Sequence, residues 1–93
     1  MNMYVMMLIT QNTLCMLQKV AGVYSRYRIN IEHLNASRHS ESLSYWNVVV
    51  NTSDEKMELL INQLKKIVGL VEVKVIDKMP LSETVKSVIN DKF

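Results

Sequence analysis

The chain has 93 residues, enough for one domain with one core, and folding at this size hides roughly two thirds of the surface that the unfolded chain exposes. Hydrophobic residues make up 48% and charged residues 22% of the chain, which is ordinary for a globular domain and argues against a disordered linker. The net charge of +2 comes from 11 basic and 9 acidic residues spread along the chain, so no run of cations is suited to nucleic acid.

A buried strand and an amphipathic helix open the chain. Residues 3–10 form a short apolar run followed by polar residues 11–13, a pattern typical of a strand buried on both faces. No basic residue precedes this run, and it is shorter than the roughly twenty apolar residues of a membrane span, so we expect a cytoplasmic protein without membrane insertion. From residue 13 the apolar side chains recur at helical spacing and predict a helix that ends near Tyr27. Its predicted buried stripe is Leu14, Leu17, Val20, Ala21 and Tyr24.

A β-hairpin is predicted after this helix. Residues 30–38 alternate loosely, residues 39–42 are turn-like, and residues 43–51 are rich in β-branched and aromatic side chains. The second strand of the hairpin carries apolar side chains on both faces, whereas the first has a mostly polar alternate face.

The second helix has the clearest boundary signals in the sequence. Thr52 or Ser53 can cap its start, acidic residues 54–55 favour the positive end of its dipole, and Gly69 is expected to end it. Its predicted buried stripe is Met57, Leu60, Ile61, Leu64 and Ile67.

A last strand completes the element order βαββαβ. Residues 71–76 alternate between valines and mostly polar side chains. This order permits an α+β, ferredoxin-like sandwich, in which a four-stranded antiparallel sheet carries two helices on one face. Because the first and third strands are apolar on both faces, we place them in the centre and the other strands at the edges. The domain is expected to cover residues 1–78, and residues 79–93 form a tail with helical spacing after Pro80.

Helices on one face would leave apolar side chains of the central strands on the other. We expect Val5 and Met7 of the first strand and Trp46 and Val48 of the third to share that face. An apolar patch of several hundred Å² usually marks an interaction site, so the patch predicts a partner, a second copy or the tail.

The sequence offers little that is suited to catalysis or metal binding. The two glycines, Gly22 and Gly69, are too few for a glycine-rich phosphate loop. His33 and His39 have no cysteine or acidic cluster at metal-ligand spacing, so no metal is expected. Cys15 has no second cysteine for a disulfide, and we interpret it as a small apolar filler.

Two other kinds of function are conceivable on the same layout, and the residues favour neither. An acylphosphatase-like hydrolase would need an arginine and open backbone amides in the first loop, but residues 11–14 offer no cation. A surface for single-stranded RNA lacks the required stacking signature. That surface would have used Arg26, Tyr27, Arg28, Arg38, Tyr45 and Trp46.

Two stretches of the chain resemble a known family. Residues 12–32 resemble the opening of the ACT domain in the small, regulatory subunit of acetolactate synthase (acetohydroxyacid synthase). Residues 54–56 and 63–73 resemble the second helix and last strand of that family, so the resemblance spans residues 4–77. The residues in register are Asn12, Leu17, Val20, Gly22, Asn30, Ile31 and Glu32.

The resemblance implies a homodimeric regulator without catalysis or cofactor of its own. Family members bind the large, catalytic subunit of acetolactate synthase, which holds thiamine diphosphate, and raise its activity. Many also confer feedback inhibition by a branched-chain amino acid such as valine, held where the first loop of one copy meets a strand of another. Carried over, the effector-binding residues are Asn12, Thr13, Leu14, Cys15, Asn30 and Ile31. A stand-alone ACT amino-acid sensor with another client is the alternative.

The chain departs from the family at two glycines. Cys15 replaces the glycine of the first loop, a residue type that lets the backbone approach a ligand or adopt a positive φ, which argues against effector binding. Arg28 replaces a glycine before the second strand, so we expect a different turn there.

Overall fold

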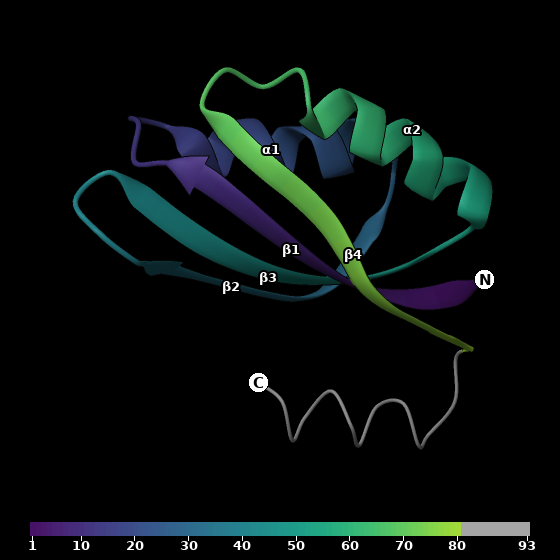
Figure 1. Cartoon of the computed structure of the whole chain (residues 1–93). Coiled ribbons are helices and arrows are strands. Elements are labelled where there is room, and N and C mark those ends of the chain that lie inside the picture. The colour runs from purple at the N-terminus through teal and green to yellow at the C-terminus, as the bar shows by residue number, and fades with distance from the viewer. Residues whose placement is uncertain (81–93) are drawn as a thin grey trace.

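Residues 1–80, the part of the chain that the computed structural model describes, form the predicted βαββαβ order (Figure 1). The elements are β1 (Asn2–Gln11), α1 (Met16–Arg26), β2 (Asn30–Arg38), β3 (Leu43–Thr52), α2 (Asp54–Leu64) and β4 (Leu70–Pro80). The first two residues assigned to the tail thus belong to β4, and the rest of the predicted tail helix lies outside the described residues.

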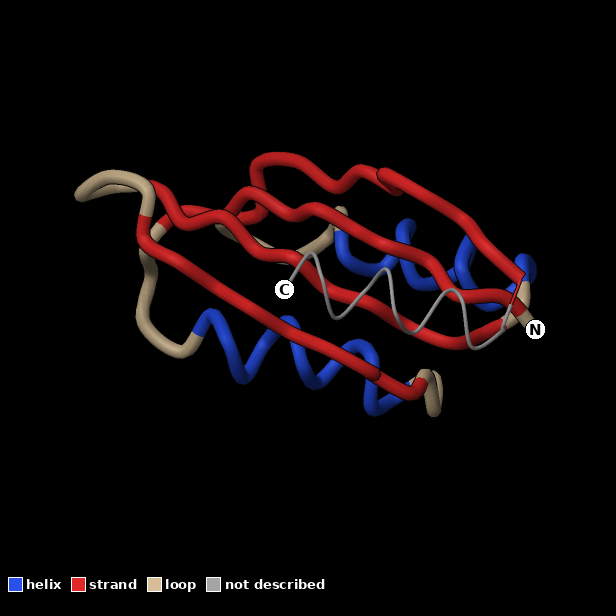
Figure 2. The backbone as a smooth tube through the Cα atoms, turned by 90° about the horizontal axis from the view of Figure 1, so that it is seen from below, coloured by secondary structure: helices blue, strands red, loops and turns tan. Residues whose placement is uncertain are grey.

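The described strands make one antiparallel sheet in the order β2-β3-β1-β4. As predicted, β1 and β3 are central and β2 and β4 lie at the edges. Both α1 and α2 cover the same face of this sheet (Figure 1), and Figure 2 views the strands from the other side. The fold is therefore the predicted ferredoxin-like sandwich.

The main core lies between the sheet and α1 and α2. Because side chains alternate along a strand, every second residue of β1 and β3 points at the helices. Burial of each large apolar side chain contributes about 1.5–3 kcal/mol. The strands contribute Tyr4, Met6, Leu8, Trp46, Val48 and Val50, and the helices contribute Met16, Val20, Val23, Tyr24, Met57, Leu60 and Leu64.

The buried stripe of α1 differs from the prediction. The helix begins at Met16 rather than near residue 13, because Cys15 adopts the left-handed conformation with φ 65° and turns the chain. Leu14 therefore lies before the helix and is 89% exposed, and Leu17 is 57% exposed. Val20 and Tyr24 are buried as expected, and Met16 and Val23 complete the buried face.

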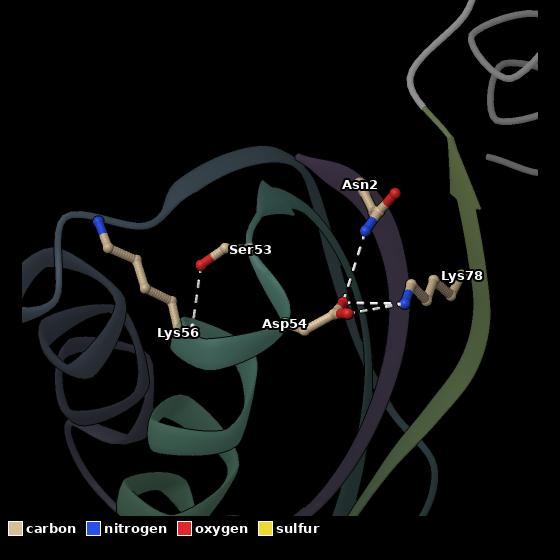
Figure 3. A network of polar contacts seen from close by, with 5 residues as sticks. All are labelled: Asn2, Ser53, Asp54, Lys56 and Lys78. Atoms are coloured by element: carbon tan, nitrogen blue, oxygen red, sulfur yellow. Dashed lines mark hydrogen bonds and ion pairs between the residues drawn. The ribbon is translucent and has the colours of Figure 1, made fainter.

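The start of α2 was predicted correctly and its end was not. The Oγ of Ser53 accepts a hydrogen bond from the backbone N–H of Lys56 at 3.3 Å (Figure 3). The helix ends at Leu64, because the N–H groups of Lys66 and Ile67 bond to carbonyls three residues back, those of Gln63 and Leu64. Gly69, with φ +98°, then leads into β4.

A polar network joins the start of α2 to two strands. The Nζ of Lys78 in β4 lies 2.9 Å from Oδ1 of Asp54, and the Nδ2 of Asn2 in β1 donates to the same oxygen at 3.4 Å (Figure 3). The side chains of Lys78 and Asp54 are largely exposed, so the ion pair contributes only about 0–1 kcal/mol to stability.

Candidate functional site

The first loop, residues 12–15 between β1 and α1, is held to the β2–β3 hairpin by Asn12. Its Nδ2 donates to the carbonyl oxygens of Ser40 and Glu41, both at 3.0 Å, and its Oδ1 accepts from the Oγ of Ser44. Its backbone N–H donates to the carbonyl oxygen of Ser42 at 2.9 Å. Both amide hydrogens of Asn12 are therefore engaged within the chain, and this side chain cannot donate to a ligand carboxylate.

The loop is also packed against the turn before β4. The backbone N–H of Gln11 donates to the carbonyl oxygen of Gly69 at 2.7 Å. A Cβ added to Gly69 would lie 2.7 Å from Cε of Met16 and 3.4 Å from Oγ1 of Thr13. Two separate connections of the fold thus fix the path of this loop.

Cys15 and Arg28 occupy the backbone conformation that glycine adopts most readily. Their φ angles are 65° and 55°, and they are the non-glycine residues with positive φ within residues 1–80. Both stand where the family that the sequence resembles has glycine. The φ angle of Arg28 is one that glycine would adopt at this position, so it gives no evidence for the different turn expected there.

The strand part of the predicted effector site lies at the opposite end of the sheet. Asn30 pairs with Asn51, which pairs with Met3 near the start of β1, whereas the loop follows Gln11. From residue 3 to residue 11 is eight residues, which at about 3.4 Å each span about 27 Å. One chain therefore does not bring the loop and Asn30 together.

The side chains of the strand part and the loop differ in exposure. Asn30 is exposed and its Nδ2 donates to Oε1 of Glu32 at 3.0 Å, while Ile31 is half-buried and packs against the main core. Thr13, Leu14 and Cys15 are exposed.

The predicted partner face is divided between the two sides of the sheet. Val5 and Met7 point away from α1 and α2, but Trp46 and Val48 are 4% and 0% exposed and lie in the main core. The error concerns the register, because β3 pairs Val49 rather than Val48 with Val5. Sequence alternation alone does not fix which alternate set of β3 matches that of β1.

The face away from α1 and α2 carries its own apolar cluster. Met3, Val5 and Val49 are 3%, 2% and 0% exposed, and Met79 packs against them. Further along β1, Met7 and Ile9 are half-buried on the same face. Val5 is therefore buried within the chain, and Met7 and Ile9 are the apolar side chains of β1 that stay partly accessible on this face.

Sequence reasoning missed a groove between α1 and α2. It has a volume of about 350 Å³ and is lined by Lys19, Val23, Arg26, Gln63, Lys66, Ile67 and Val68. The available signal was the spacing of Lys19, Val23 and Arg26, which places two cations and one apolar side chain on one helix face.

Neither a metal centre nor a membrane helix is found in the described part of the chain. Within residues 1–80 no three His, Cys, Asp or Glu side chains gather as they would around a metal ion. In the same range, neither α1 nor α2 has the length and apolar character that crossing a bilayer requires.

A family model for the AHAS small subunit-like ACT domain matches residues 6–72. No curated protein matches the chain. Among solved structures, the small subunit of acetolactate synthase from Thermotoga maritima is similar with a TM-score of 0.73 and 25% sequence identity. That match covers 81% of this chain and 47% of the T. maritima chain, so this chain spans about half its length.

Two further solved structures are similar at lower identity. The ACT domain from GTP pyrophosphokinase of Chlorobium tepidum has a TM-score of 0.67 at 16% identity, over 80% of this chain and 96% of that one. GqqA, a quorum quenching acylase, has a TM-score of 0.75 at 16% identity, over 91% of this chain and 31% of that one. At this identity the likeness shows the fold alone.

Proposed function

The chain belongs to the family of AHAS small subunit-like ACT domains, and from this membership we propose that it is a regulatory subunit of acetolactate synthase. In this role it binds the catalytic subunit and raises its activity, without catalysis of its own. Thiamine diphosphate is then held by the catalytic subunit and not by this chain. The observation that carries the proposal is the family match over residues 6–72, supported by the likeness to the T. maritima small subunit.

We propose that the active form is a homodimer joined through the exposed edge of β2. An edge strand presents unpaired N–H and C=O groups that a second copy can use. Antiparallel pairing of two β2 strands would bring Asn30 of one copy beside Arg38 of its partner. Arg38 pairs with Ser44, which lies next to Asn12 in the first loop. Such a dimer would therefore reunite the two parts of the effector site that a single chain separates.

A branched-chain amino acid is the proposed effector of this two-chain site. The side chain of Asn12 is engaged within the chain, so the carboxylate of the effector would be held by the free N–H groups at the start of α1. Cys15 makes no side-chain cap there, and the first turn carries no acidic residue. The left-handed conformation of Cys15 supports effector binding, because the backbone already has the shape that the family glycine allows. Cys15→Gly should strengthen valine binding by removing the Cβ beside the ligand.

The role is tested by mixing the purified chain with the catalytic subunit encoded in the same genome. We expect a stable complex and a rise in acetolactate formation at equimolar ratio. Valine titrated into the complex, and into a Cys15→Gly complex, then tests the effector site by thermal shift. Absence of both complex formation and any activity change would overturn the proposal, while unchanged thermal shifts in both forms would overturn only the effector site.

A stand-alone amino-acid sensor is the second candidate, because a similar ACT fold occurs in the GTP pyrophosphokinase of Chlorobium tepidum. Calorimetry distinguishes the two functions: a sensor binds valine or another small amino acid but forms no complex with the catalytic subunit. We expect no acyl phosphate hydrolysis in either case, since residues 12–15 bring no cation to the first loop. Either function is proposed to operate in the cytoplasm.

A further inference from the structure

The groove lies between α1 and α2, the two helices that cover one face of the sheet (Figure 1). Apolar side chains form part of its lining. Val23 from α1 is 5% exposed and belongs to this lining with Ile67, which packs against the main core. Val68, which also lines the groove, is 82% exposed. The groove can therefore take up apolar side chains from outside the chain.

The same groove is lined by three cations. Lys19 and Arg26 come from α1, and Lys66 follows α2. Within residues 1–80 the ion pairs are Lys74 with Glu72 and Lys78 with Asp54, so none of the groove cations is paired there. The sequence of α1 contains no acidic residue, and the remaining polar lining residue is the neutral Gln63. The groove therefore has a positive potential that complements carboxylates.

Gly22 adds room for a close approach along the same face of α1. It lies three residues after Lys19 and four before Arg26, spacings that share one helix face. It is exposed, and a Cβ at this position would meet nothing within 4 Å in the chain. Glycine inside a helix is less favourable than alanine, and no contact within the chain requires it here.

We propose that this groove docks an acidic segment with apolar side chains carried by the catalytic subunit, an inference that rests on the proposed regulatory function. The apolar side chains of the segment would cover Val23, Ile67 and Val68. Its carboxylates would pair with the groove cations. A wholly apolar segment would leave those cations desolvated and unpaired, which is costly, so charge complementarity selects an acidic one.

Two neighbouring lysines provide a matched test in the full chain. Lys66 lines the groove, whereas Lys65, which is also exposed and precedes it in the sequence, does not. Lys66→Glu should weaken association with the catalytic subunit at least tenfold, measured as Kd at fixed salt, whereas Lys65→Glu should change it less than twofold. Arg26→Glu should behave like Lys66→Glu. The thermal midpoint of each variant alone checks that it is folded.

A variant expected to be more stable separates docking from folding. Gly22→Ala should raise the thermal midpoint of the chain, because alanine favours the helix, and should weaken association several-fold by filling the approach. The groove proposal is overturned if Lys65→Glu and Lys66→Glu weaken association equally, or if neither Lys66→Glu nor Gly22→Ala weakens it. In both cases the association of the wild type still supports the proposed function.

Two further outcomes also decide against the groove. Failure of the wild-type chain to associate would overturn the groove and the proposed function together. The second outcome concerns inorganic pyrophosphate. If pyrophosphate stabilises the wild type but not Lys66→Glu, while both proteins associate equally well with the catalytic subunit, the groove is a small-anion site. That result would overturn the docked acidic segment.

Discussion

At the scale of single residues, the strained backbone of Cys15 and Arg28 stands out. Both are exposed, so neither side chain buries enough surface to offset the cost of its positive φ. For a residue other than glycine that cost is about 1–2 kcal/mol. Cys15 nevertheless keeps this conformation, because Gln11 and Asn12 fix the chain before it through hydrogen bonds to Gly69 and Ser42. At Arg28 the backbone N–H groups of Arg28 and Ile29 donate to the carbonyl oxygens of Ser25 and Tyr24.

Glycine at either position should therefore stabilise the chain. Cys15→Gly and Arg28→Gly are each expected to raise the free energy of unfolding by about 0.5–1 kcal/mol, the relief of strain less the added entropy of the unfolded chain. Urea denaturation measures the difference. Ser25→Gly, at an exposed position inside α1, is the control and should lower stability by a similar amount. A loss of stability on Cys15→Gly and Arg28→Gly would contradict the strain.

Tyr24 is expected to make the stability of the fold depend on pH in the alkaline range. It is 1% exposed, its hydroxyl donates to Sδ of Met6 at 3.6 Å, and burial raises the pKa of Tyr24 above its ordinary value of 10.0. Ionisation is then easier in the unfolded chain, so the contribution of Tyr24 to stability is complete below pH 10 and is lost as pH rises above it. Tyr24→Phe should lose less than about 1 kcal/mol at pH 7 for the weak hydrogen bond.

The measurement is the free energy of unfolding of wild type and Tyr24→Phe at pH 7 and pH 11. The wild type should lose its advantage at the higher pH and fall below the variant. Parallel pH profiles for the two proteins would show that Tyr24 does not titrate differently on unfolding.

At the scale of elements, the connections are tied to one another more than the sequence indicates. Asn12 links the first loop to the β2–β3 hairpin, and Gly69 links it to the turn before β4. Removing either link should loosen the end of the sheet where the first loop lies.

Asn12→Ala should destabilise the chain by about 1–2 kcal/mol, since it removes two hydrogen bonds to carbonyl oxygens and one from the Ser44 hydroxyl, and water can reach the groups left behind. Asn12→Asp keeps an acceptor for Ser44 but places a negative charge against the carbonyls of Ser40 and Glu41, so it should be at least as harmful. Chemical denaturation with Asn35→Ala, an exposed position in β2, as control tests both. If Asn12→Ala is as stable as the control, the hydrogen bonds of Asn12 to the β2–β3 hairpin do not stabilise the fold.

Gly69→Ala should lower the free energy of unfolding by about 1–3 kcal/mol, because alanine is strained at φ +98° and its Cβ would clash with Met16. Gly22→Ala is the matched control, since there the added Cβ meets open space and should stabilise. Thermal unfolding of the two variants should therefore move in opposite directions. A Gly69→Ala variant as stable as the wild type would contradict the close packing.

Most of the element pattern could be predicted because its signals are local. The Ser53 cap, the valine alternation of β4 and the two-sided apolar strands are visible within a few residues. The start of α1 was misplaced because Cys15 takes a conformation that its residue type does not suggest. The face of Trp46 was misassigned because it depends on how β3 pairs with β1, about forty residues away in sequence.

At the scale of the whole molecule, the fold separates its surfaces by chemistry. The helix layer carries the cationic groove, the sheet face away from the helices leaves Met7 and Ile9 partly exposed, and the edge of β2 is polar and exposed. The predicted effector residues could be named from the resemblance, but their separation within one chain depends on the strand register. An effector site formed by two copies would reconcile the sequence motif with the sheet.

The proposed regulatory role is tested most directly by acetolactate formation by the catalytic subunit as this chain is titrated into it, with complex formation followed in parallel. We expect activity to rise and to saturate at equimolar ratio, with a complex that contains both proteins. An activity curve that stays flat while no complex forms would contradict the role.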